Sequence, residues 1–185
     1  ITFYLLGLFG AILLNGSSYQ NSAQHIYHGW QEVEIENYEL FTPTDWVYLG
    51  SENLQNGLVR NYTFSKDTNS AIDVIISNDN FYGDSRKEIE LYINSTKKVY
   101  RKKLKYVKEY RSEWDTANTH RFMYAATENG VENYFIQDFI FTGKHFVSVI
   151  YSFRDKEWKP NKKEAVYILN SFRSIKPNST LDSMM

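Results

Sequence analysis

The sequence predicts an α+β domain built on a mainly antiparallel β-sheet. Aromatic residues, which suit the pleated surface of a sheet, are abundant: 15 Tyr, 12 Phe and 4 Trp. Residues 132–153 form two long apolar segments around the turn Thr142-Gly143-Lys144, and a short segment with helical spacing follows them. Strands joined by short turns pair antiparallel, and amphipathic helices must cover a face or an edge of the sheet. We therefore expect a sheet flanked by two or more helices.

The first half of the chain is dominated by predicted strands. Alternation of apolar and polar residues predicts three of them, at residues 32–40, 58–65 and 71–77. Pro43 favours extended geometry in its predecessor and lies in a turn that leads to a short extended piece at residues 46–48. Polar residues at 66–70 predict a turn, and those at 78–84 predict a loop.

A helix is expected after this loop. Ser85, with Glu88 three residues later, matches a capping box, and apolar residues then recur at helical spacing to about Leu104. The period next falls to two, which predicts two further strands, at residues 106–114 and 121–128. Asn129-Gly130 is a strong hairpin signal and predicts that the second of these strands turns directly into the next.

The last helix is expected over residues 161–172, where Asn161 and Glu164 can cap its first turn. It should pack onto the sheet through its apolar residues, Ile168, Leu169 and Phe172. The central strand beneath it should contain Val147, Val149, Ile150 and Tyr151. Truncating Phe172 to Ala would then cost about 3–5 kcal/mol, as large-to-small changes in a core do.

The N-terminal segment suggests export. Residues 1–14 are uncharged and mainly apolar, but are shorter than the roughly 20 residues that span a bilayer. Such a run, followed by the small residues Gly16-Ser17-Ser18, is typical of a secretory signal, whereas the alternative is a buried strand or helix of the fold. We expect a signal peptide and spacer at 1–23, one domain at 24–178 and a flexible tail at 179–185. The mature protein would be periplasmic, attached to the cell envelope or secreted.

Composition excludes several classes of chemistry. The chain has no cysteine, so disulfides, zinc–thiolate sites and cysteine catalysis are excluded. The net charge of −1 argues against nucleic-acid binding driven by bulk charge. His25 and His28 are three residues apart, but they lie in a polar stretch with no further ligand at a metal-site spacing. We expect neither a metal nor a cofactor.

The strand pattern places the carboxylate of Asp138 among apolar neighbours, because Asp138 alternates with Ile136 and Ile140. A desolvated carboxyl group there would have a raised pKa, while a bulge or an edge strand would instead turn it outward. The second function that we consider is therefore a small exported hydrolase, with Asp138 acting beside His120 or His145. No partner acid or nucleophile stands at a fixed spacing from it.

A basic segment at residues 97–111 is the strongest charge feature. It contains eight cations and one anion, a charge of +7, so the rest of this chain of net charge −1 carries −8. The candidate binding residues are Lys97, Lys98, Arg101, Lys102, Lys103, Lys105 and Lys108. Helical spacing would bring Lys97, Arg101 and Lys105 together if the helix extends that far. The segment is either the solvated end of a helix or a docking surface for an anionic membrane surface or an acidic protein.

Several local patterns together resemble the PsbP-like proteins, the superfamily of the extrinsic photosystem II subunit. Trp46 follows a turn that contains proline, and a long helix follows the early strands. Two segments are similar to the family's final strand and terminal helix: Gly143-Lys144-His145-Phe146-Val147-Ser148-Val149 and Ile168-Leu169-Asn170-Ser171-Phe172-Arg173. The resemblance covers residues 32–176. It implies an α/β/α sandwich and a non-catalytic role in binding or assembly, with no catalytic residue to carry over.

Overall fold

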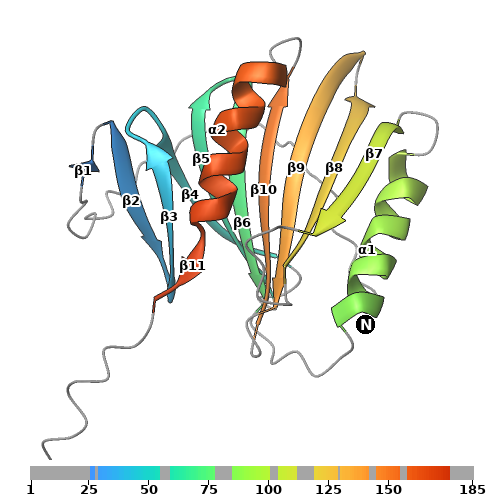
Figure 1. The fold of residues 1–185 in the computed structure, drawn as a ribbon, viewed down its shortest axis with the longest axis horizontal. Helices are drawn as coiled ribbons and strands as arrows, with labels where there is room; N and C mark the ends of the chain where they lie inside the picture. The colour runs from blue at the N-terminus through green and yellow to red at the C-terminus, as the bar shows by residue number, and fades with distance from the viewer. Residues whose placement is uncertain are drawn as a thin grey trace, which may run out of the picture.

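The computed structural model describes nine segments of the chain, at residues 26–27, 29–54, 59–77, 85–100, 104–111, 119–128, 130–141, 145–154 and 158–175. The predicted signal peptide, the tail at 179–185 and the Thr142-Gly143-Lys144 turn lie outside the described residues. So do His25 and His28, and the side chains of the Ser85 and Glu88 capping box. Within the described segments, two helices and mostly antiparallel strands confirm the α+β class (Figure 1).

The larger of the two sheets has seven strands. They are β4 (Val47–Leu54), β5 (Val59–Asp67), β6 (Ser70–Ser77), β7 (Leu104–Arg111), β8 (Thr119–Glu128), β9 (Val131–Phe141) and β10 (Phe146–Arg154). Their order across the sheet is β4-β5-β6-β10-β9-β8-β7, with antiparallel pairing throughout. The predicted central position of β10 is thus confirmed. The β8–β9 hairpin is also confirmed, since Glu128 pairs with Val131 and leaves two residues for the turn.

The smaller sheet corrects one prediction. It consists of β1 (Ile26–Tyr27), β2 (Trp30–Ile35), β3 (Tyr38–Pro43) and β11 (Arg173–Ser174). The single strand predicted at residues 32–40 is wrong, because the chain reverses at Glu36, whose φ is +55°, and Ile35 pairs with Tyr38. The buried residues change phase there, since Ile35 and Tyr38 are three apart and not two. That phase change is the sequence signal of the hairpin.

The two helices begin or end at residues different from those predicted. Helix α1 (Ser85–Tyr100) ends before Leu104, which starts β7. Helix α2 (Trp158–Ser171) starts before Asn161, so the predicted cap formed by Asn161 and Glu164 is wrong. Its first turn contains Pro160, a residue that sequence rules associate with helix starts because the first backbone N–H groups have no helical acceptor.

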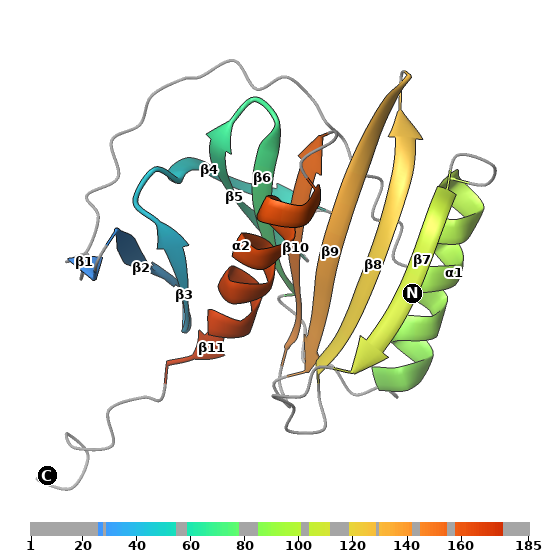
Figure 2. The ribbon, with the colours of Figure 1, turned by 45° about the horizontal axis from the view of Figure 1, so that its top comes forward.

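Each helix packs against its own apolar cluster. In β8, β9 and β10 alternate residues belong to different clusters, so the clusters lie on opposite faces of the large sheet. One cluster joins α2 to both sheets, through Ala165, Ile168 and Leu169 with buried residues such as Leu40, Ile136 and Tyr151. The other joins Ile89 and Ile93 of α1 to residues such as Phe122 and Phe139. Figure 2 shows α2 between the small sheet and β10, with α1 beside β7.

Phe172 occupies a less central position than the sequence predicts. It follows the last residue of α2, is only partly buried, and stacks on Tyr38 of the small sheet with ring centroids 5.2 Å apart. Ile168 and Leu169, by contrast, are 0% and 3% exposed. The helix therefore docks mainly through Ile168 and Leu169, while Phe172 secures the crossing to β11.

Candidate functional site

Asp138 forms a buried ion pair with Arg121 of the neighbouring strand. Arg121 donates from Nε to Asp138 Oδ1 and from Nη2 to Asp138 Oδ2, both at 2.6 Å, and also from Nη2 to Asn170 Oδ1 of α2 at 2.8 Å. The register of β8 and β9 places Arg121 directly opposite Asp138. The prediction that Asp138 is desolvated is confirmed, and the outward-turned alternative is wrong. Burial raises the pKa of Asp138, and the hydrogen bonds and charge of Arg121 oppose that rise.

The ion pair with Arg121 argues against Asp138 as the base of the alternative hydrolase site. Both oxygens of Asp138 accept hydrogen bonds from a guanidinium group that stays protonated, so the carboxylate is engaged and is not poised as a base. His120 lies near enough for its charge to lower the pKa of Asp138. His145 lies just before β10, where its Nδ1 is 2.9 Å from the carbonyl oxygen of Ser77. The pair instead fastens β8, β9 and α2 to one another.

The basic segment is divided between two elements. Lys97 and Lys98 are exposed on the last turn of α1, where cations favour the negative end of the helix dipole. Lys105 and Lys108 belong to β7, so helical spacing does not relate Lys105 to Lys97 as predicted. Arg101, Lys102 and Lys103 lie outside the described residues, as do the side chains of Lys105 and Lys108. The role of the segment in docking stays a prediction.

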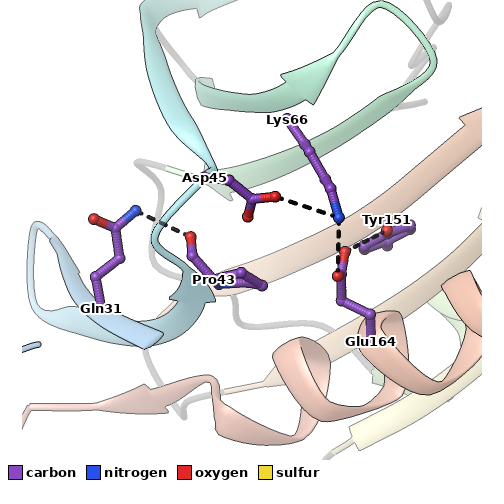
Figure 3. Close-up of polar contacts among 6 residues, drawn as sticks. All are labelled: Gln31, Pro43, Asp45, Lys66, Tyr151 and Glu164. Atoms are coloured by element: carbon purple, nitrogen blue, oxygen red, sulfur yellow. Dashed lines mark hydrogen bonds and ion pairs between the residues drawn. The ribbon is translucent and has the colours of Figure 1, made fainter. Parts of the chain in front are cut away.

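A polar group fastens α2 to the start of β4, as Figure 3 shows. Lys66 Nζ lies 3.4 Å from Asp45 Oδ2 and 3.3 Å from Glu164 Oε2. Tyr151 donates its hydroxyl hydrogen to Glu164 Oε1 at 2.9 Å. One cation thus faces two carboxylates, and the group retains a net negative charge next to β4. Nearby, Gln31 donates to the carbonyl oxygen of Trp46 at 2.8 Å, which fixes the turn before β4.

A second polar group lies on the opposite face of β5 and β6. Asp73 Oδ1 accepts hydrogen bonds from Thr63 Oγ1 at 2.7 Å and from Asn61 Nδ2 at 3.4 Å. Burial raises the pKa of Asp73, the two hydrogen bonds lower it, and the charge of Glu52 raises it further, with a net upward shift. The ionised form of Asp73 is therefore less favourable in the folded protein than in water.

Strand β4 is the exposed edge that sequence reasoning missed. Among the described strands it pairs only with β5, and its first three residues, Val47, Tyr48 and Leu49, are 59%, 36% and 43% exposed. The sequence predicted only a short extended piece at 46–48 because Gly50-Ser51-Glu52-Asn53 lacks apolar alternation. Three successive large apolar residues before a polar run were the available signal.

In the part of the chain that the structure describes, no three histidine, aspartate or glutamate side chains form a group suited to a metal ion. Neither α1 nor α2 has the length and apolar character needed to cross a bilayer.

Comparison with solved structures supports the fold-level relation to PsbP. The solution structure of cyanobacterial PsbP (CyanoP) from Synechocystis sp. PCC 6803 matches with a TM-score of 0.60 at 12% identity, covering 86% of this chain and 98% of that one. The Ran-binding protein Mog1p of Saccharomyces cerevisiae matches with a TM-score of 0.55 at 11% identity, covering 80% and 96%. No family model and no curated protein matches the chain. At these identities the likeness establishes a PsbP-like fold.

Proposed function

We propose that this chain is an exported, non-catalytic binding or accessory module whose partner is another protein. The observation that carries this proposal is the exposed apolar start of β4 on an edge of the large sheet. Natural sheets protect such edges, because unpaired backbone groups beside apolar side chains favour pairing with another chain. An edge that keeps this character is suited to recognition of a protein.

The comparisons with solved structures also support a role in binding another protein. Among the solved structures with this fold, one is a Ran-binding protein and another is a cyanobacterial PsbP. A fold by itself does not fix function, so the proposal relies on the β4 surface and takes the fold as secondary support. We also propose that α1 and α2 are the outer layers of an α/β/α sandwich around the large sheet, as the PsbP-like resemblance implies. The basic segment offers a second docking surface, for an anionic membrane surface or an acidic protein.

Export is the other part of the proposal, and it depends on the uncharged segment at residues 1–14. The natural host, carrying the gene with a C-terminal affinity tag, is fractionated, and the N-terminus of the purified protein is sequenced. We expect the mature chain to start near Ser18 and to be recovered outside the cytoplasm. Recovery in the cytoplasm with residues 1–14 intact would contradict export without affecting the proposed binding role.

The binding role is tested in the same cells by chemical cross-linking before purification. We expect one protein to be recovered in a fixed ratio to the tagged chain, and a complex to form again when the two purified proteins are mixed. An unrelated tagged protein sent to the same compartment is the control. Absence of a protein enriched above this control, in each compartment where the chain is found, would contradict the binding role.

A further inference from the structure

Strand β4 carries an apolar surface that the described part of the chain leaves exposed. We propose that β4 binds an extended apolar segment of a partner protein as an added β-strand, and that this segment carries Lys or Arg at its flanks. The proposal deepens the proposed function, because it names the surface and the chemistry of the partner.

The exposure of β4 is greater than a half-buried strand allows. In a strand with one face on a core, alternate side chains are buried, yet Val47, Tyr48 and Leu49 are all exposed. The register between β4 and β5 shifts between Tyr48 and Gly50, so Leu49 is the extra residue of a bulge. Tyr48 lies against Phe64, with ring centroids 5.2 Å apart, so the exposed ring continues the buried core outward. Tyr48 is therefore held against the core, and exposed apolar side chains flank it on both sides in the sequence.

The backbone of β4 offers the second element of recognition. A strand at the end of a sheet has N–H and C=O groups on its outer side that pair with an incoming strand. Proteins usually block this pairing with lysine or proline, and β4 contains neither between Val47 and Leu54. The bulge at Leu49 limits regular pairing to the segment from Gly50 onward, so the apolar residues before it provide side-chain contacts.

Charge identifies the flanks of the partner. Asp45 lies just before the apolar residues and shares Lys66 with Glu164, which leaves that group net negative. Glu52 is the only charged residue within β4 and is exposed. Carboxylates therefore stand on both sides of the apolar residues, where they favour cations in an added strand and repel anions.

The same charges argue against a second copy of this chain as the occupant. If two β4 strands paired antiparallel over residues 50–54, Glu52 of one copy would lie opposite Glu52 of the other. Like charges at such positions are destabilising, so self-pairing of this kind brings acid against acid. A partner segment with basic flanks meets no such repulsion.

The test uses the full chain and two synthetic peptides of equal length. Both contain alternating Val and Thr residues, flanked by paired lysines in one peptide and by paired glutamates in the other. Binding of each fluorescent peptide is followed by polarisation. We expect the lysine-flanked peptide to bind more tightly, and Leu49→Lys to weaken its binding by at least about tenfold. Leu91→Lys is the matched control, because Leu91 is 55% exposed on α1, away from β4.

Two further arms separate strand addition from simple adhesion. Lysine-flanked peptides with N-methyl groups on alternate residues lose hydrogen bonding along one edge, so one of the two possible patterns should lose binding. Glu52→Lys should weaken binding of the lysine-flanked peptide and strengthen that of the glutamate-flanked one. If both N-methylated peptides bind like the parent, or if Leu49→Lys and Leu91→Lys have equal effects, the proposal is wrong.

Sedimentation of the unmodified chain decides between occupants. A concentration-dependent dimer that Leu49→Lys abolishes would assign β4 to a second copy and overturn the proposed occupant. If a protein partner found in cells binds Leu49→Lys as tightly as the unmodified chain, the binding role stands and the assignment to β4 fails. If peptide binding follows the expected pattern but no cellular partner exists, the proposed function fails while the chemistry of β4 stands.

Discussion

Arg121 donates two parallel hydrogen bonds of 2.6 Å to Asp138, and each side chain is only 3% exposed. The same guanidinium group reaches Asn170 of α2, so one side chain connects two strands and a helix. Bidentate geometry is the strongest form of this ion pair, but both charges are removed from water. The intact pair therefore adds little net stability, but loss of one member should destabilise the fold strongly.

Replacing Asp138 with Ala should lower the free energy of unfolding by about 3–5 kcal/mol, because it leaves the Arg121 charge buried without its main partner. Urea denaturation monitored by circular dichroism measures this loss. The double variant Arg121→Met/Asp138→Leu should recover most of it, since apolar residues of similar volume fill the site without a charge.

Lys66→Met is the control for this prediction. It breaks ion pairs that are partly exposed, and its cost should be about 0–1 kcal/mol. Equal losses for Asp138→Ala and Lys66→Met would mean that the buried pair has no special role in joining α2 to the sheet.

Ile168→Ala should destabilise the fold more than Phe172→Ala does. Ile168 is a fully buried residue of α2 that packs against the sheets, and such truncations cost about 2–5 kcal/mol. Phe172 is partly buried and stacks on Tyr38, so we expect a cost of about 1–3 kcal/mol, below the value predicted from the sequence. Thermal and urea unfolding of both variants measure which loss of stability is larger. Lys163→Ala, at an exposed position, is the reference and should change stability by close to zero. A larger loss at Phe172 would place the main anchor of α2 at its C-terminal end.

Ionisation of Asp73 should lower the stability of the fold as the pH rises above the ordinary pKa of an aspartate. Its pKa in the folded protein is raised, mainly by burial, so the folded state holds the proton over a pH range in which the unfolded state has lost it. Ionisation of Asp73 therefore lowers stability between its unfolded and its folded pKa. Asp73→Asn should remove this slope, as measured by urea unfolding across pH, whereas the exposed Asp67→Asn should keep it. If the pH dependence of stability is unchanged in Asp73→Asn, a different titratable group causes it.

The basic segment should bind anionic surfaces in a manner sensitive to salt. Replacing Lys98, Arg101 and Lys102 with Glu should abolish binding to vesicles that contain anionic lipid, because the local positive field is reversed. Binding by the unmodified chain should weaken as salt is raised, since screening acts over about 10 Å at 0.1 M. Vesicle co-sedimentation measures both effects.

The matched control for the basic segment replaces Lys87, Arg154 and Lys163, which are exposed and lie outside the segment, with Glu. It changes the net charge by the same amount. If both triple variants lose binding equally, net charge and not this segment drives the interaction. If neither loses binding, residues 97–111 are only a solvated surface.

Local patterns in the sequence were enough to predict most elements of the fold. Period-two and helical spacing predicted β5, β6, β8, β9 and β10, together with α1 and the last helix, because residues that face a core must recur at the period of their element. The same patterns predicted that Asp138 would be desolvated among apolar neighbours. Export and the role of the basic segment stay predictions.

Tertiary structure decided what these patterns could not encode. Arg121 becomes the partner of Asp138 only through the register of β8 and β9, and Asn170 joins them only when α2 docks. The exposure of Val47, Tyr48 and Leu49 depends on β4 being the last strand in the order, and strand order is not a local property. Spacing along the chain reports which face a residue occupies, whereas pairing between distant segments determines its neighbours and whether a face or an edge stays open to a partner.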